Sequence, residues 1–117
     1  HCKEMPLAYS LSDVVVSASI EPEAFGRISV EAQSMGKPII ASNIGGSKET
    51  IINKKTGLLY KHNDPRELAK NLNTVIQLSL DELKSMGNEG RKNIAKKFDV
   101  ETMCQSNLKE YKRLIKN

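Results

Sequence analysis

Two glutamates on either side of a Phe-Gly pair are the side chains best suited to bind a ligand. Glu23 follows a β-branched segment, residues 13–19, and Glu31 lies in the helix predicted to come next. Gly26 would let a ligand approach the backbone at that helix N-terminus, where free N–H groups favour phosphate. A carboxylate at Glu31 would face the sheet and is costly without partners, and sugar hydroxyls are good partners. These residues therefore predict one ligand pocket, lined by Glu23, Gly26 and Glu31, at the carboxyl edge of the sheet.

A purely structural role for both glutamates is equally compatible with the spacing. Glu23 would then be a loop acid, and Glu31 would cap or pair locally, because acidic residues are common in early helical turns. The choice between a ligand site and local pairing stays open on the spacing alone.

Other arrangements of reactive side chains are weaker. His1 and His62 lie far apart in the sequence, and no Ser-His-Asp or Cys-His order stands out. The chain has neither a P-loop nor a G-x-G-x-x-G fingerprint. Cys2 and Cys104 have no metal-binding spacing, so we expect two free thiols in a reducing compartment and no bound metal.

Strands alternate with helices along the chain, which is typical of a parallel sheet built from βαβ units. Strands are predicted over residues 13–19, 38–42 and 57–60, and the first two are expected to be buried. The predicted helices cover residues 5–10, 27–35, 47–52 and 65–76, a stretch after residue 79, and the residues from 100 onward. The loops after the first two strands fall at carboxyl ends, where open α/β sheets bind ligands. We therefore expect an α/β fold: a partial, Rossmann-like parallel sheet with flanking helices and a helical C-terminal tail.

Several residues mark where the helices begin, end or weaken. Gly36 is expected to cap a helix C-terminus, and Asp64 and Ser79 are expected to cap the N-termini of two later helices. Gly87 and Gly90 suggest a weak point within the helix that follows Ser79. The predicted apolar faces comprise Leu68, Ala69, Leu72, Val75 and Ile76 in one helix and Val100, Met103, Cys104, Leu108, Tyr111, Leu114 and Ile115 in the last.

Composition and charge narrow the possible functions. The 117 residues suit one small domain, and the net charge of +4 is compatible with anionic ligands or surfaces. Basic residues concentrate from residue 84 onward, at a spacing typical of a solvated helix face. Few aromatic residues accompany them, so we do not expect nucleic acid as a partner. No apolar run is long enough to span a bilayer and no signal peptide is recognisable, which by default predicts a cytoplasmic protein.

A series of short motifs runs in unbroken order from about Met5 to Leu72. The motifs are Tyr9-Ser10, Ser12-Asp13, Glu23, Phe25-Gly26, Glu31-Ala32, Met35-Gly36-Lys37-Pro38, Gly45-Gly46-Ser47-Lys48-Glu49 and Thr56-Gly57-Leu58. Together they resemble the family 4 retaining glycosyltransferases of the GT-B fold, although each motif alone would be weak. The segment from Glu23 to Arg27 is most similar to transferases that build bacterial cell-envelope polysaccharides, including lipopolysaccharide.

The resemblance implies a nucleotide-sugar donor site. Glu23 would contact the donor sugar, and backbone amides near Phe25 and Gly26 would face the sugar and the diphosphate. Glu31 would bind the ribose hydroxyls of the nucleotide. Arg27 could partly serve the diphosphate, although an exposed arginine at a helix start is the alternative. In such enzymes these glutamates bind the donor, and none is assigned here as a catalytic base.

The neighbouring glycine-rich loop belongs to the same implied site. Gly45, Gly46 and Glu49 would shape this loop beside the donor. Neither a metal nor a cofactor is expected, since the nucleotide-sugar itself is the substrate. The implied substrate-binding residues are Glu23, Ala24, Phe25, Gly26, Arg27, Glu31, Gly45, Gly46 and Glu49.

The resemblance also implies parts that this sequence does not match. The family holds the donor diphosphate with an Arg and a Lys on earlier elements of the same domain, and a separate N-terminal domain binds the acceptor. We therefore expect residues 1–117 to be part of a C-terminal donor-binding domain, without the acceptor domain or the first strands of its own domain. The isolated chain is then expected to be inactive, and to self-associate or to require the missing N-terminal half.

The expected function is retaining transfer of a sugar from a nucleotide-sugar donor to a cell-envelope polysaccharide or a lipid-linked acceptor. If the acceptor is lipid-linked, we also expect peripheral contact of the protein with the inner face of the membrane. The alternative is a non-catalytic remnant or subunit that binds the donor weakly or binds only a protein partner. The unmatched basic pair favours this alternative for the chain alone.

Overall fold

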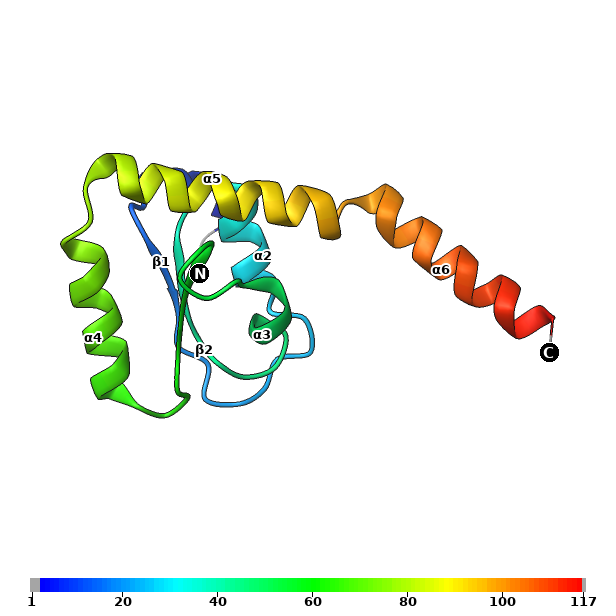
Figure 1. Cartoon of the computed structure of the whole chain (residues 1–117), viewed down its shortest axis with the longest axis horizontal. Coiled ribbons are helices and arrows are strands. Elements are labelled where there is room, and N and C mark those ends of the chain that lie inside the picture. Colours follow the sequence, from blue (N-terminus) through cyan, green and yellow to red (C-terminus); the bar gives the residue numbers. More distant parts are fainter. Residues whose placement is uncertain (1–2, 117) are drawn as a thin grey trace.

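The computed structural model describes residues 3–116 and has the predicted alternation of strands and helices (Figure 1). The helices are α1 (Met5–Leu11), α2 (Arg27–Ser34), α3 (Ser47–Thr50), α4 (Pro65–Ile76), α5 (Leu80–Lys97) and α6 (Val100–Ile115). The strands are β1 (Val15–Ser17), β2 (Ile39–Ser42) and β3 (Gly57–Tyr60). The predicted α/β architecture is confirmed, with strand β3 at the predicted residues.

Within the described residues the strands form a three-stranded parallel sheet in the order β1-β2-β3. Val15 pairs with Ile39, and Ile39 pairs in turn with Gly57. The central strand β2 is buried throughout, as predicted, whereas β1 contains an exposed residue, Val16. The strand predicted over residues 13–19 is therefore confirmed only for Val15–Ser17, and the prediction that it is buried on both faces was wrong. β1 has a hydrogen-bonded neighbour on one side only, so its β-branched residues are covered less completely than those of β2.

The core lies on both faces of the sheet because successive side chains of β2 point in opposite directions. The cluster on one face comprises Tyr9, Ala32, Ile39, Ala41 and Ile51, and the cluster on the other comprises Ile40, Leu58, Tyr60 and Val75. Helices α1 and α2 thus cover one face, and α4 covers the other. This burial on both sides explains why the strand reads as a continuous apolar run.

Capping residues set the helix ends where they were predicted. Asp64 accepts hydrogen bonds from the backbone N–H groups of Arg66 and Glu67 at the start of α4. Ser79 forms a complete capping box with Glu82 at the start of α5. Each cap supplies acceptors for N–H groups that have no partner inside the helix, so the local sequence alone determines these boundaries.

The glycines of α5 are packing contacts, and their prediction as a weak point was wrong. The helix is continuous from Leu80 to Lys97 and packs against α2. A Cβ atom at Gly87 would collide with the carbonyl oxygen of Gly36, and one at Gly90 would lie 3.1 Å from Cγ of Gln33. The lack of side chains therefore lets α5 approach α2 and the turn before β2 closely.

The predicted apolar face of α4 is only partly buried. Val75 is buried and Leu68 and Leu72 are half-buried against the same cluster, as the period predicts. Ala69 and Ile76 were assigned wrongly, since Ala69 is exposed and Ile76 is 77% exposed. The buried face of α4 is thus narrower than the face that its apolar residues predict.

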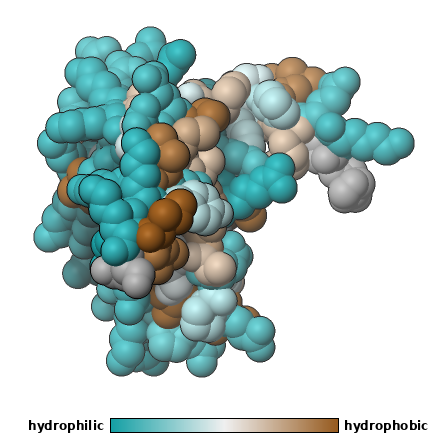
Figure 2. Space-filling model, turned by 90° about the vertical axis from the view of Figure 1, so that its right-hand side faces the viewer, coloured by the Kyte–Doolittle hydropathy of each residue, from teal (hydrophilic) through white to brown (hydrophobic). Residues whose placement is uncertain are grey.

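Helix α6 projects from the body of the molecule (Figure 1), and every residue of it is exposed. Its predicted apolar residues, including Tyr111 and Cys104 with its free thiol, are therefore uncovered. Figure 2 looks onto the end from which α6 projects and shows apolar groups exposed beside hydrophilic surface. Cys2 lies outside the described residues.

Candidate functional site

Two loops meet at the carboxyl ends of β1 and β2, as the parallel topology requires. The hydroxyl of Ser42 donates a 2.8 Å hydrogen bond to the carbonyl oxygen of Ser19. The backbone N–H of Gly46 donates another, also 2.8 Å, to the carbonyl oxygen of Glu23. The structure therefore joins the segment that carries the first glutamate to the glycine-rich segment, although the sequence separates them by the whole of α2.

Gly45 and Gly46 make this close approach possible. A Cβ atom at Gly45 would lie 2.6 Å from the backbone nitrogen of Glu23, and one at Gly46 would lie 2.7 Å from Cα of Phe25. Gly45 also has a φ of +57°, a backbone conformation that other residues rarely adopt. The expectation that these two glycines shape the neighbouring loop agrees with this geometry.

Gly26 caps the N-terminus of α2 in a left-handed conformation, with a φ of +70°. A Cβ atom here would lie 3.2 Å from the backbone nitrogen of Ser47. The close backbone approach predicted for a ligand is therefore also an approach between two loops of the chain itself. Substitution of Gly26 would strain the fold as well as any site at this helix N-terminus.

The exposed side chains at the carboxyl edge of the sheet come from the loop after β1, called the first loop below, and from α3. Glu23, Ala24 and Phe25 are all exposed, and Oε1 of Glu23 accepts a 2.6 Å hydrogen bond from the hydroxyl of Ser19. Glu49 is exposed in α3. Ser19 thus orients the Glu23 carboxylate while leaving it accessible.

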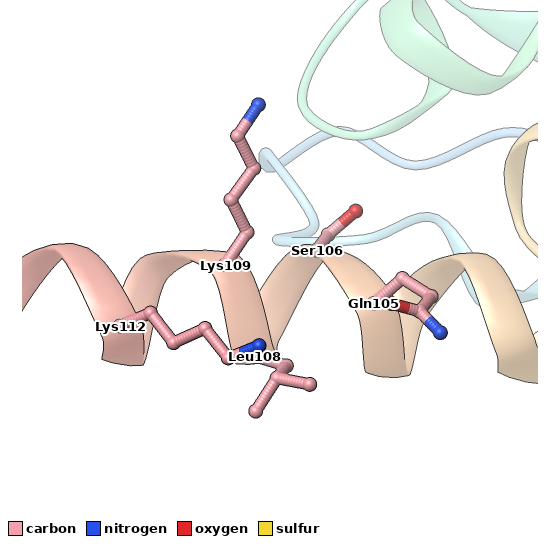
Figure 3. Close-up of a pocket in the computed structure, with 5 residues that line it drawn as sticks. All are labelled: Gln105, Ser106, Leu108, Lys109 and Lys112. Atoms are coloured by element: carbon pink, nitrogen blue, oxygen red, sulfur yellow. The ribbon is translucent and has the colours of Figure 1, made fainter.

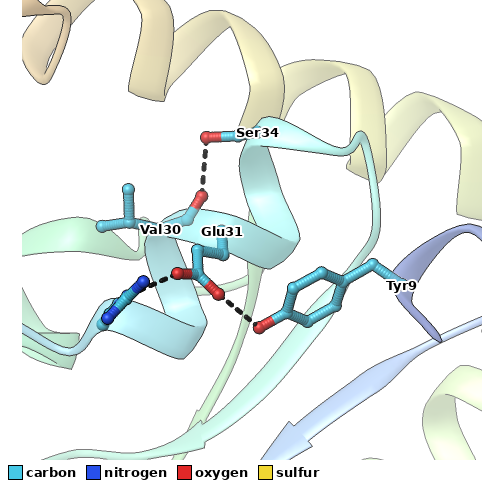
Figure 4. Close-up of polar contacts among 5 residues, drawn as sticks. Tyr9, Val30, Glu31 and Ser34 are labelled. Carbon is cyan, nitrogen blue, oxygen red and sulfur yellow. Dashed lines mark hydrogen bonds and ion pairs between the residues drawn. The ribbon is translucent and has the colours of Figure 1, made fainter. Parts of the chain in front are cut away.

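Glu31 lies on α2 and is held by two partners (Figure 4). The phenol of Tyr9 donates a 2.9 Å hydrogen bond to its Oε2, and Nε of Arg27, one turn earlier on α2, donates to its Oε1. The predicted need for partners is met by these two side chains. Because the Arg27 side chain is 85% exposed, its ion pair contributes little to stability, while Tyr9 is buried.

These contacts shift both pKa values in directions that keep the pair together. The Arg27 guanidinium lowers the pKa of Glu31, burial opposes this, and the hydrogen bond from Tyr9 lowers it further. Burial raises the pKa of Tyr9 to about 12, and the hydrogen bond to Glu31 raises it in the same direction. At neutral pH the pair is therefore a carboxylate that accepts from a neutral phenol.

A groove of about 590 Å³ runs between α1 and α2 beside this carboxylate. It is lined by Met5, Pro6, Tyr9, Arg27, Ile28, Glu31, Ser34 and Met35. Neither Glu23 nor Gly26 lines it, so the structure does not bring the three predicted residues into this one cavity. The reason is that Glu31 lies on the side of α2 that faces α1, whereas Glu23 packs toward the glycine-rich loop.

Another hollow, of about 410 Å³, lies on α6 and is lined by Gln105, Ser106, Leu108, Lys109 and Lys112. Figure 3 shows that all these side chains come from the one helix, and each is exposed. This hollow has no carboxylate and no contact with the loops at the sheet edge. It lacks the convergent polar groups of a ligand site.

Residues 3–116 contain no group of three or more His, Cys, Asp or Glu side chains that could hold a metal ion. No helix in this part of the chain is both long and apolar enough to cross a membrane.

Reasoning from the sequence missed two contacts at this edge. Tyr9 was noted only as part of a motif, with no role as the partner of Glu31. The ring of Phe98 lies 5.8 Å from the ring of Phe25, centroid to centroid, and this contact was not foreseen. Neither pair is close in sequence, so no local pattern could have indicated them.

Comparison with known proteins connects this geometry to a family. Residues 2–93 match the family model described as Glycosyl transferases group 1. The chain belongs to the group 1 glycosyl transferases. Its parallel sheet with flanking helices, within the described residues, is the Rossmann-like arrangement of a GT-B fold.

The relatives of this glycosyl transferase chain are considerably longer than the chain itself. Spore coat protein SA of Bacillus subtilis is 30% identical over 112 residues, which are 95% of this chain and 29% of that protein. The capsular polysaccharide biosynthesis glycosyltransferase CapM of Staphylococcus aureus is 33% identical over 96 residues, covering 75% of this chain and 25% of that protein. The chain thus spans less than a third of the length of these relatives.

Two solved structures are similar to nearly the whole chain. A glycosyltransferase from Rickettsia africae has 38% sequence identity and a TM-score of 0.91, covering 100% of this chain and 31% of that one. Anabaena HepE, solved in complex with UDP, has 28% identity and a TM-score of 0.88, covering 96% of this chain and 30% of that one.

Proposed function

We propose that this chain supplies the donor side of a glycosyltransferase site and binds a nucleoside diphosphate sugar. The observation that carries the proposal is the pairing of the loops after β1 and β2, beside the N-terminus of α2 and the Glu31 groove. Open parallel sheets bind ligands at this edge. Support also comes from Anabaena HepE, which is similar to the chain and was solved with UDP and with UDP-glucose.

Glu31 is suited to bind the ribose of the nucleotide. Its lowered pKa keeps it ionised at neutral pH, and Arg27 and Tyr9 each occupy only one lone-pair position on its two oxygens. A carboxylate offers about four such positions, so two hydroxyl groups can still donate to it. The groove beside it, about 590 Å³ in volume, is within the usual size of ligand pockets.

The diphosphate and the sugar would lie toward the paired loops. The first-turn N–H groups of α2 follow Gly26 and have no partners within the helix, which suits an anion. Arg27 would add positive charge there. The Glu23 carboxylate, oriented by Ser19, would accept hydrogen bonds from the donor sugar. Ala24 and Phe25 would contribute backbone amides, and the remaining proposed contacts to the donor are Gly45, Gly46 and Glu49.

The proposed reaction transfers the sugar with retention to a cell-envelope polysaccharide, including lipopolysaccharide, or to a lipid-linked acceptor. The bond between the anomeric carbon and the diphosphate oxygen breaks and releases the nucleoside diphosphate. A bond to an acceptor hydroxyl oxygen forms as the proton of that hydroxyl passes to the released diphosphate. We place these residues in the C-terminal domain of a family 4 type enzyme that uses neither metal nor cofactor. A lipid-linked acceptor would place the reaction at the inner face of the membrane. The acceptor side and the basic pair for the diphosphate would come from other parts of a complete enzyme.

Titration calorimetry with UDP, UDP-glucose and GDP-mannose tests donor binding by the purified chain. Replacing Glu31 by Gln removes a charged acceptor, which is worth about 1.5–3 kcal/mol and thus about tenfold or more in Kd. Glu110→Gln is the matched control, because Glu110 also pairs with an arginine but lies on α6. The proposal fails if no nucleotide binds the parent chain, or if both variants weaken binding equally.

A second candidate is a non-catalytic subunit that binds the donor weakly or binds only a protein partner. The observation that favours it is α6, whose apolar residues are all exposed. The calorimetric titration distinguishes a donor-binding chain from a subunit that binds only a protein partner. Such a subunit would give no heat of binding with UDP, UDP-glucose or GDP-mannose.

A further inference from the structure

The rings of Phe25 and Phe98 form an edge-to-face contact between the first loop and the end of α5. Their centroids are 5.8 Å apart and their planes are inclined by 69°. Aromatic rings favour this arrangement because the positive edge of one faces the negative face of the other. The contact joins a loop at the sheet edge to the junction between α5 and α6.

Hydrogen bonds fix the backbone on both sides of Phe98 at this junction. Its backbone N–H donates a 2.8 Å hydrogen bond to the carbonyl oxygen of Ile94, a buried residue of α5. The next residue, Asp99, caps α6 by accepting a 2.8 Å hydrogen bond from the N–H of Thr102. The backbone that carries the Phe98 ring therefore continues the last turn of α5, which packs against α2.

The backbone of Phe25 is also held in place, by the glycine-rich loop. Its backbone packs so closely on Gly46 that a Cβ atom there would overlap it. The N–H of Gly46 also bonds to the carbonyl oxygen of Glu23, two residues earlier. The segment from Glu23 to Gly26 is thus held on its backbone side by the glycine-rich loop and at its aromatic side chain by Phe98.

We propose that Phe98 is a positioning residue for the donor site: its ring holds Phe25 and so sets the backbone that faces the donor sugar and diphosphate. This inference rests on the proposed function, because it assigns a role to the same loop. Phe25 is 51% exposed, and Phe98 supplies an aromatic contact on the covered part of its ring. Phe98 itself lies on a different element and would not touch the donor.

The first experiment measures the loop directly in the full chain, without any ligand. Phe98→Ala is expected to shift the amide NMR signals of Gly26, Gly45 and Gly46, while Phe98→Tyr, which keeps an aromatic edge, leaves them near their original positions. Val100→Ala removes another exposed apolar side chain from the same region and is the control. Phe25→Ala should give the same pattern of shifts as Phe98→Ala, and the double variant should add little to either.

The second experiment measures affinity for UDP and UDP-glucose by calorimetry. Phe98→Ala should weaken binding about threefold to tenfold, which is what an aromatic pair of this kind is worth, and Phe98→Tyr should restore it. Thermal melting of each variant shows whether the fold is intact. If Phe98→Ala melts far below the parent, Phe98→Leu, which keeps apolar bulk without an aromatic edge, replaces it in both experiments.

Each outcome decides a separate question. Unchanged loop signals in Phe98→Ala, or shifts no larger than those of Val100→Ala, would overturn the positioning role. Altered loop signals with unchanged affinity would overturn its link to the donor. If the parent binds neither UDP nor UDP-glucose, the proposed donor function fails, whereas the amide signals still decide whether Phe98 positions the loop.

Discussion

The phenol of Tyr9 on α1 donates a 2.9 Å hydrogen bond to Oε2 of Glu31 on α2. The bond joins two helices on one face of the sheet and holds the carboxylate at the rim of the groove between them. Tyr9→Phe should therefore destabilise the fold by about 1.5–3 kcal/mol, since the bond has a charged acceptor. Urea denaturation measures this. The matched change Tyr111→Phe, on exposed α6, should cost almost nothing, and equal losses in both variants would contradict the role of Tyr9.

The pH dependence of the free energy of unfolding should depend on the same pair, Tyr9 and Glu31. The folded-state pKa of Glu31 is lowered from 4.5, so its contribution is complete above pH 4.5 and is lost as the pH falls through the folded value. Stability measured between pH 6 and about 3 should therefore fall more steeply for the parent than for Glu31→Gln. Parallel curves would show that Glu31 is not linked to folding.

The raised pKa of Tyr9 predicts a loss of stability at alkaline pH. Its folded-state pKa is raised from 10.0 to about 12, so its contribution is present below pH 10 and is lost as the pH rises toward 12. The parent should lose its advantage over Tyr9→Phe in this alkaline range. Burial also raises the pKa of Tyr60, so the absorbance of phenolate in an alkaline titration should show late-ionising tyrosines in the parent and one fewer of them in Tyr9→Phe.

The glycines of the loop pair should tolerate no side chain. Gly46→Ala places a Cβ atom on the backbone of Phe25, and we expect a loss of about 2–4 kcal/mol or failure to fold. Gly36→Ala is the matched control: Gly36 has a φ of +69° but open space around the new Cβ atom, so it should cost only about 1–2 kcal/mol. Thermal denaturation compares the two, and a smaller loss at Gly46 would contradict the close loop contact.

The glycines of α5 make a similar test within a helix. Gly87→Ala should destabilise the domain by about 2–4 kcal/mol, because its Cβ atom meets a backbone carbonyl that cannot move aside. At Gly90 the nearest atoms belong to the flexible side chain of Gln33, and the gain in helix propensity of about 1 kcal/mol offsets part of the strain. Gly90→Ala should therefore be the milder change in urea denaturation.

The isolated chain should show no transferase turnover. Transfer requires donor and acceptor to be held together, and diphosphate departure requires positive charge that the proposed basic pair would supply, worth about 10²-fold or more for each group. A release assay for UDP from UDP-glucose, combined with sedimentation, checks both activity and association. A stable monomer with ordinary turnover would show that the chain needs neither partner nor further residues.

Features that depend on neighbours in the chain could be predicted from the sequence. Asp64 and Ser79 cap their helices because the amides that they accept from lie two or three residues ahead. Strand β3 was recognisable from a short apolar run after a turn. The motifs around Glu23 and Glu31 indicated a glycosyltransferase of the GT-B fold, because they combine residue types at fixed short spacings.

The tertiary structure decided which side chains meet. Gly87 has low helix propensity wherever it stands, and only the carbonyl of Gly36 makes it a required contact. Val75 and Ile76 are both apolar, yet one is buried and the other exposed because α4 presents only one side to the sheet. These outcomes depend on distances through space between segments far apart in the chain, and the pairing of Tyr9 with Glu31 or Phe25 with Phe98 has no counterpart in local spacing.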